Sequence, residues 1–306
     1  MVLLGVPAAA QTSLEMSPMG TATLISPYYF GPNAFPVPEM LDGRVSETLR
    51  VELAADRFYG HRGDRTTDVA FKINIPLWTP RANLTVWMPA VEWFRNTDLN
   101  MAECRVLPEH REAARKGHES GDVYLSIDMH LLTERKFRPD ITVRAALKTA
   151  SGNAYYLARY YDSPGYFFDA SIAKSFALGH GPMNHRLRVV LSAGFLCWQT
   201  DNGRQNDATM FGAMLKYENR RFSVSQSFSG YSGWEHTLKE GGAAHDIPVT
   251  LRTNFSYRIR SWEIVAVYQY GLRDWPYQQV RIGFAKSWDI LKRGRKAVGR
   301  GSAGGE

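Results

Sequence analysis

Residues 248–260, PVTLRTNFSYRIR, decide the fold of this chain because apolar and polar residues alternate along them. One parity carries Val249, Leu251, Phe255, Tyr257 and Ile259, and the other carries Thr250, Arg252, Asn254, Ser256 and Arg258. A β-strand sends successive side chains to opposite faces, so this segment has one apolar face and one charged face. Such a strand suits a barrel with lipid outside and a polar lumen, and it also suits a soluble sheet.

Eleven further stretches alternate in the same way, so the sequence predicts an all-β protein of about twelve strands. We expect the other strands at residues 48–59, 68–78, 83–94, 122–132, 140–149, 166–176, 186–198, 208–217, 222–231, 262–272 and 277–288. The parity of the third stretch breaks near Pro89, which predicts a bulge or an early strand end. The gaps after odd-numbered strands up to the ninth are long and polar, and those after even-numbered strands are shorter. Transmembrane barrels show this asymmetry, with long loops outside and short turns inside.

The composition narrows the classes of protein that the chain can belong to. The chain has 306 residues and a mean hydropathy of −0.32, and no uninterrupted apolar run reaches the roughly 18 residues of a membrane helix. The 8 Trp and 15 Tyr suit the aromatic girdles of a membrane barrel. The net charge of +7 is spread along the chain without a nucleic-acid-binding motif, so we expect no nucleic-acid partner.

The sequence divides into four parts. Residues 1–10 end in three alanines, an A-x-A cleavage pattern, and are expected to be a signal peptide whose basic beginning is missing. Residues 11–47 are rich in Pro and aromatics, and are expected to form a periplasmic leader or a plug, with a linker as the simpler alternative. Residues 48–288 form the expected barrel, and 289–306 a basic, Gly-rich tail.

Over about residues 48–288 the chain resembles bacterial outer-membrane β-barrel proteins of the porin-like kind, without matching one subfamily. In the last strand Arg281, Gly283 and Trp288 fit the signal that such barrels present to the insertion machinery, whereas Lys286 stands at an apolar position. The resemblance implies an antiparallel up-and-down barrel in the bacterial outer membrane, with the lipid bilayer and the insertion machinery as partners. The alternative is a soluble all-β barrel or sandwich whose charged faces meet water.

In a membrane barrel the polar strand faces line the lumen. The charged residues expected there are Arg50, Lys72, Asp128, Arg144, Lys148, Asp169, Arg188, Arg252, Arg258 and Arg281. Their basic excess predicts a narrow passive channel for small polar solutes with a weak preference for anions. Alternatively, opposite charges pair across neighbouring strands and fill the interior, and the barrel has a structural or surface-binding role.

A hydrolase is the second alternative. The triplet His118-Glu119-Ser120 resembles the His-x-Ser pair of outer-membrane phospholipases, in which an Asn assists the histidine. No matching Asn follows Ser120, which is expected in a loop, so we expect the chain not to be an enzyme. The histidines show no tight ligand spacing, and no phosphate-binding loop joins a strand to a helix. The sequence therefore predicts neither a metal nor a cofactor.

Overall fold

The computed structural model describes residues 31–103, 108, 111–152, 164–179, 183–199, 205–233, 236–239, 242–245 and 247–291. The expected signal peptide and most of the expected tail lie outside these residues. Within the described part, no helix combines the length and the apolar character that crossing a membrane requires.

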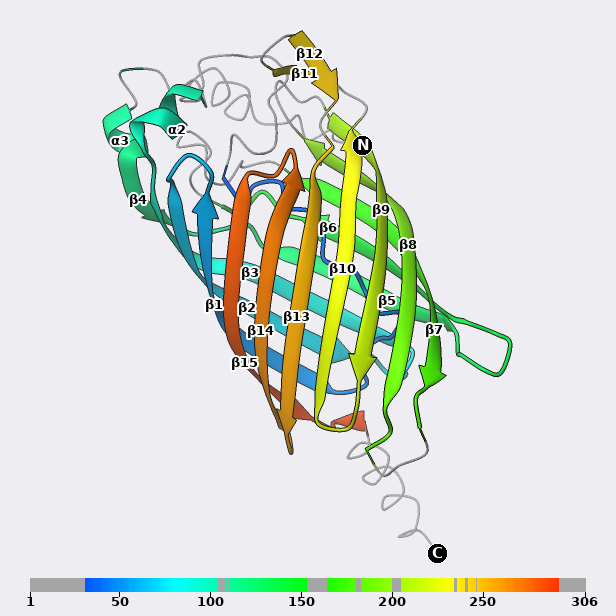
Figure 1. Ribbon diagram of the computed structural model, residues 1–306. Coiled ribbons are helices and arrows are strands. Elements are labelled where there is room, and N and C mark those ends of the chain that lie inside the picture. Colours follow the sequence, from blue (N-terminus) through cyan, green and yellow to red (C-terminus); the bar gives the residue numbers. More distant parts are fainter. Residues whose placement is uncertain are drawn as a thin grey trace, which may run out of the picture.

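Twelve antiparallel strands form a closed barrel (Figure 1). Each strand pairs with its neighbours along the chain, and the first pairs with the last, which closes the ring. The strands are β1 (Leu49–Gly60), β2 (Arg65–Pro76), β3 (Ala82–Arg95), β5 (Tyr124–Leu132), β6 (Asp140–Lys148), β7 (Gly165–Ala177), β8 (Arg186–Gln199), β9 (Gln205–Glu218), β10 (Phe222–Gly233), β13 (Val249–Ile259), β14 (Trp262–Arg273) and β15 (Tyr277–Trp288). The predicted all-β up-and-down barrel of about twelve strands is confirmed.

The two ends of the barrel differ. At the upper end in Figure 1, which we call the loop end, lie the helices α2 (Asp98–Glu103) and α3 (Arg111–Arg115) and a small hairpin of β11 (His236–Lys239) and β12 (Gly242–His245). The short strand β4 (Lys116–Glu119) extends the sheet there by pairing with the end of β3. The opposite end, the turn end, carries the short connections and the end of β15.

One connection differs from the prediction. The loop after β1 comprises only four residues, 61–64, because β2 begins at Arg65 and remains paired with β1 up to Tyr59. The amide of Gly60 donates to the carbonyl of Asp64, and Gly63 takes a φ of +83°, which a glycine adopts without strain. The prediction of a long first loop is therefore wrong. The predicted irregularity at Pro89 is confirmed, since the β2–β3 register shifts between Val69 and Ala70.

The two faces of the wall settle which solvent surrounds the barrel. Large apolar side chains on the outer face are more than half exposed, among them Leu53, Leu191 and Ile282. Inside, polar side chains such as Asp56 and Gln269 are buried. A soluble barrel has the opposite arrangement, so these surfaces require lipid outside and a polar lumen within.

Aromatic residues mark the edge of this apolar band at the turn end. The Nζ atom of Lys286 lies 4.6 Å from the ring centre of Trp262 and 5.3 Å from that of Trp288. A long lysine side chain can remain on the apolar surface while its ammonium group meets aromatic rings at the membrane edge. This contact explains why Lys286 is accommodated where an apolar residue was expected.

Candidate functional site in the barrel lumen

Residues 31–48, which we call the lumen segment, run inside the barrel from the loop end to the turn end before β1 begins (dark blue in Figure 1). Pro32, Pro36 and Pro38 lack backbone donors, so the segment is unsuited to joining the sheet. Near the loop end Phe35 is fully buried, with its ring 6.3 Å from that of Trp198.

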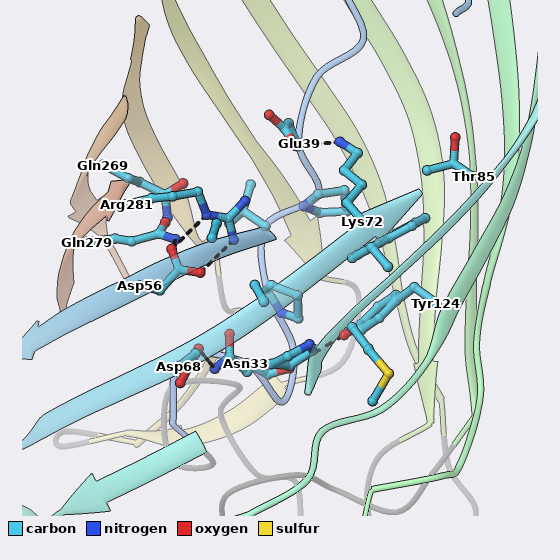
Figure 2. Close-up of a pocket in the computed structure, with 18 of the residues that line it drawn as sticks. Asn33, Glu39, Asp56, Asp68, Lys72, Thr85, Tyr124, Gln269, Gln279 and Arg281 are labelled. Carbon is cyan, nitrogen blue, oxygen red and sulfur yellow. Dashed lines mark hydrogen bonds and ion pairs between the residues drawn. The ribbon is translucent and has the colours of Figure 1, made fainter. Parts of the chain in front are cut away.

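A first set of hydrogen bonds fixes the upper part of the lumen segment (Figure 2). The side-chain amide of Asn33 donates to Asp68 at 2.5 Å and to Glu92 at 2.8 Å, two carboxylates on β2 and β3. The hydroxyl of Tyr124 donates to the carbonyl of Asn33 at 3.4 Å. These contacts tie the segment to three strands of the wall.

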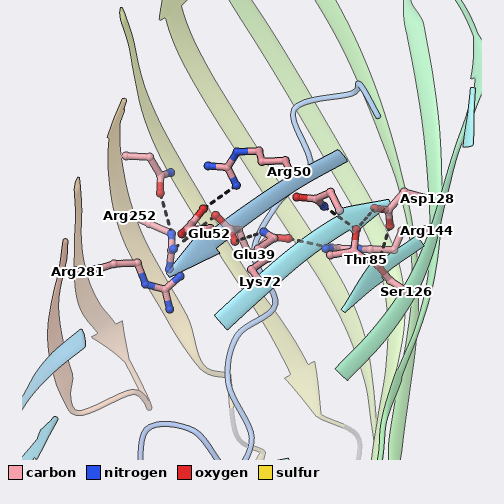
Figure 3. A network of polar contacts seen from close by, with 12 residues as sticks. Glu39, Arg50, Glu52, Lys72, Thr85, Ser126, Asp128, Arg144, Arg252 and Arg281 are labelled. Carbon is pink, nitrogen blue, oxygen red and sulfur yellow. Dashed lines mark hydrogen bonds and ion pairs between the residues drawn. The ribbon is translucent and has the colours of Figure 1, made fainter. Parts of the chain in front are cut away.

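Glu39 forms the second anchor, at mid-height (Figure 3). Its carboxylate lies 3.3 Å from Lys72 and 3.4 Å from Arg252, which approach from β2 and β13. Arg144 donates to the backbone carbonyl of Glu39 at 2.9 Å and pairs with Asp169 at 2.6 Å. One carboxylate of the lumen segment therefore links cations from different sides of the barrel.

The third anchor lies near the turn end. Asp42 accepts from Lys216 at 2.6 Å, and Arg44 pairs with Glu218 at 2.7 Å. Arg188 donates to the backbone carbonyl of Asp42 at 2.7 Å and forms an ion pair of 2.6 Å with Asp140. The lumen segment is thus fixed to the wall at three heights.

The remaining predicted lumen residues also lie on the inner face, where most are paired. Arg50 bridges Glu52 and Glu263 at 2.7 and 3.0 Å. Arg281 pairs with Asp56 at 2.7 Å.

The last three predicted residues differ in exposure. Lys148 and Asp122 form a fully buried ion pair, and the carboxylate of Asp128 accepts hydrogen bonds from three neighbouring polar side chains. Arg258 is 61% exposed and lies 3.9 Å from Glu263. Nine of the ten predicted residues are thus held by close partners, and Arg258 faces solvent.

A cavity of about 170 Å³ remains between the lumen segment and one side of the wall. The strands β1, β2, β3 and β5 supply most of that wall, and β6, β7, β8, β13, β14 and β15 add one or two lining residues each. Small residues such as Ala54 and Ala70 face the cavity. Five carboxylates and four cations line the cavity, namely Glu39, Glu52, Asp56, Asp68, Asp128, Lys72, Arg144, Arg252 and Arg281. Figure 2 shows Asp56, Arg281, Gln269 and Gln279 on one side and Lys72 with Glu39 on the other.

Sequence reasoning missed the lumen segment's own contribution. Asn33, Glu39 and Asp42 carry the anchors, and only the unusual Pro and aromatic content of residues 11–47 pointed to that part of the chain. Asp140 was also missed, because it lies at the first position of its strand.

The residues of the hydrolase alternative lie away from the lumen. His118 is exposed on β4, where its register partner is Trp93, and Ser120 follows the end of that strand. In the described part of the chain, no group of three or more His, Cys, Asp or Glu side chains is placed to hold a metal ion.

A solved outer membrane channel shares this architecture. No protein-family model matches the chain, and no curated protein matches it. Among solved structures, an outer membrane channel from Pseudomonas putida F1, of the COG4313 group, is 11% identical, with 84% of this chain and 97% of that chain covered and a TM-score of 0.53. The NanC porin is 9% identical, with 78% and 100% covered and a TM-score of 0.48. The KdgM porin, solved with disordered oligogalacturonate, is also 9% identical, with 78% and 99% covered and a TM-score of 0.44.

The closed barrel, its apolar outer band and its polar lumen define the class of protein. The chain is an outer-membrane β-barrel protein with a porin-like fold. Its long connections therefore face the outside of the cell and its short turns the periplasm.

Proposed function

We propose that the protein is a narrow passive channel for small polar solutes, and that solutes pass between the lumen segment and the wall of β1, β2 and β15. The observation that carries this proposal is the cavity on that side, which Ala54 lines beside its register partners Ala70 and Gly283. Three small residues side by side leave space where longer side chains would meet the lumen segment.

The expected preference for anions is small. The cavity lining carries five carboxylates against four cations, and the cations are held in ion pairs with the wall or the lumen segment. A pore selects anions when rings of unpaired Arg and Lys raise the local potential, which this lining does not provide. We therefore expect the ratio of anion to cation permeability to be close to one.

A non-conducting barrel is the second candidate. The observation that favours it is the set of anchors at three heights, which tie the lumen segment to opposite sides of the wall. In that case the barrel would act through its outer surfaces.

Single-channel recording in planar bilayers separates the two candidates. In the channel, Ala54→Trp fills the cavity and lowers the conductance strongly, because the indole occupies the space beside the lumen segment. Ala55→Trp is the matched control, since Ala55 is the next residue of β1 and faces lipid. If the wild-type protein shows no conductance above the lipid background, the channel is rejected and the non-conducting barrel remains as the candidate. Equal conductance of both variants would place the pathway elsewhere.

A further inference from the structure

A second charged region lies on the outer face of the barrel, near the loop end of β1 to β4. Two neighbouring rows of residues cross these strands in register. The row nearer the membrane centre comprises Arg57, Thr67, Trp93 and His118. The row nearer the loops comprises Tyr59, Arg65, Arg95 and Lys116. We call Arg57, Arg65, Arg95, Lys116 and His118 the outer basic cluster.

The alternation of exposure along each strand places these side chains outside. On β1, Arg57 and Tyr59 are exposed, whereas the residues that alternate with them, Asp56 and Phe58, are buried. On β3 and β4, Arg95 and Lys116 are exposed in the same way. Strands lie roughly 4.8 Å apart and alternate residues roughly 6.8 Å apart, so the cluster spans on the order of 15 Å.

The cluster has organised geometry on this lipid-facing wall. The guanidinium group of Arg65 lies 4.9 Å from the ring centre of Tyr59, and that of Arg57 lies 5.7 Å from the same ring. Arg57 also donates to the hydroxyl of Thr67. These contacts bring two guanidinium groups within 6 Å of the centre of one aromatic ring, the range of a cation–π contact.

Neither row contains a carboxylate. On β15, the register partners of Arg57 and Tyr59 are Val280 and Gln278, which carry no charge. Glu119 follows His118 on β4 but lies on the opposite parity, toward the lumen. The positive charge of the outer face is therefore not balanced within the two rows.

The position of the outer basic cluster along the strands indicates which layer of the membrane it contacts. The outward residues that precede it toward the membrane centre are apolar, namely Ala55 on β1, Val69 on β2 and Val91 on β3. Trp93 belongs to the row nearer the membrane centre and is 47% exposed, as expected of a residue at the edge of the hydrocarbon layer. The cations are thus placed at the level of lipid headgroups in the outer leaflet.

We propose that the outer basic cluster binds the phosphate groups of a phosphorylated glycolipid in the outer leaflet, of the chemical class of bis-phosphorylated lipid A. Arginine presents a planar set of donors that matches a phosphate, and several such groups within one headgroup's reach bind more than one phosphate at once. The acyl chains of that lipid would lie along the apolar band below.

The test measures binding of bis-phosphorylated lipid A to the detergent-solubilised, folded protein by native mass spectrometry. Arg65→Gln with Arg95→Gln removes the two guanidinium groups of neighbouring strands. We expect the apparent affinity to fall about tenfold or more, because charge-assisted hydrogen bonds to phosphate are lost. Arg220→Gln with Arg221→Gln is the matched control, since both residues are exposed at the turn end, and it should leave the affinity unchanged.

Three results would overturn the proposal. The first is equal affinity of the cluster variant and the wild type, with both shown to be folded by heat-dependent mobility on a gel. The second is equal binding of dephosphorylated lipid A, which would reduce the contact to the apolar band. The third is full displacement of the lipid by inorganic phosphate at equal concentration, which would indicate a site for a free anion. None of these results depends on whether the lumen conducts.

Discussion

Phe35→Ala tests whether the lumen segment closes most of the lumen. The Phe35 side chain is fully buried, close to the ring of Trp198, and the Nζ of Lys148 lies 5.8 Å from its ring centre. Truncating such a buried phenyl ring costs about 3–5 kcal/mol. Because the lumen segment is not part of the sheet, we expect this loss of free energy to destabilise the binding of the segment inside the barrel more than the barrel itself.

The free energy lost in Phe35→Ala changes the populations of two states, one with the lumen segment seated in the barrel and one with it released. A loss of about 3–5 kcal/mol lowers the ratio of seated to released segment by about two to nearly four powers of ten. In single-channel recordings we therefore expect Phe35→Ala to show frequent openings to a larger conductance that the wild type shows rarely. The anchors at Asn33, Glu39 and Asp42 remain and return the segment to its seat, so the openings should be transient.

The control for this experiment removes a phenyl ring on the other side of the wall. Phe284 is 59% exposed on the outer face of β15, and Phe284→Ala should leave the recordings unchanged. The reasoning is refuted when Phe35→Ala folds normally yet shows neither larger nor more frequent openings than the wild type.

The other predictions concern stability. Asp169→Asn leaves the buried guanidinium group of Arg144 without its ion-pair partner and should cost about 3–5 kcal/mol of unfolding free energy in urea titrations, whereas Asp98→Asn, in an exposed pair, should cost at most about 1 kcal/mol; equal costs would contradict this. Burial raises the pKa of the Glu134 carboxyl, but hydrogen bonds from Ser175 and the charge of Lys174 outweigh burial and hold that pKa below its usual range. A carboxyl group whose pKa is lower in the folded than in the unfolded state stabilises the folded protein at a pH above its unfolded pKa. This stabilisation is lost as the pH falls through the folded pKa. The difference in unfolding free energy between wild type and Glu134→Gln should therefore be largest near pH 7 and vanish in acid. A difference that does not change with pH would refute this prediction.

The barrel could be predicted because each of its strands carries its own signal. Residues 248–260 were expected to form a strand, and β13 covers Val249–Ile259; the last strand was expected at 277–288, and β15 has those bounds. Lipid outside and polar groups inside impose alternation on each strand separately, so a local pattern is sufficient. The length of β2 was less predictable, because Arg65 and Thr67 on its outer face lie at the polar membrane edge and break the apolar pattern there.

The lumen contacts could be predicted only in part. Parity identified Arg144 and Arg281 as lumen residues, but it does not show which carboxylate each residue meets. The partners of Arg252 and Lys72 include Glu39, which lies 33 residues before Lys72 and in no strand. Such pairs depend on how a segment without regular structure is seated, and no periodicity encodes that.

The position of the lumen segment also restricts the order of assembly. The segment continues directly into β1, and β1 and β15 form the seam that completes the ring. Until β1 pairs with β15, the sheet has two free edges, and the lumen segment is attached to the strand at one of them. Pairing of β1 with β15 can therefore enclose residues 31–48 sideways, so that the finished ring need not be threaded.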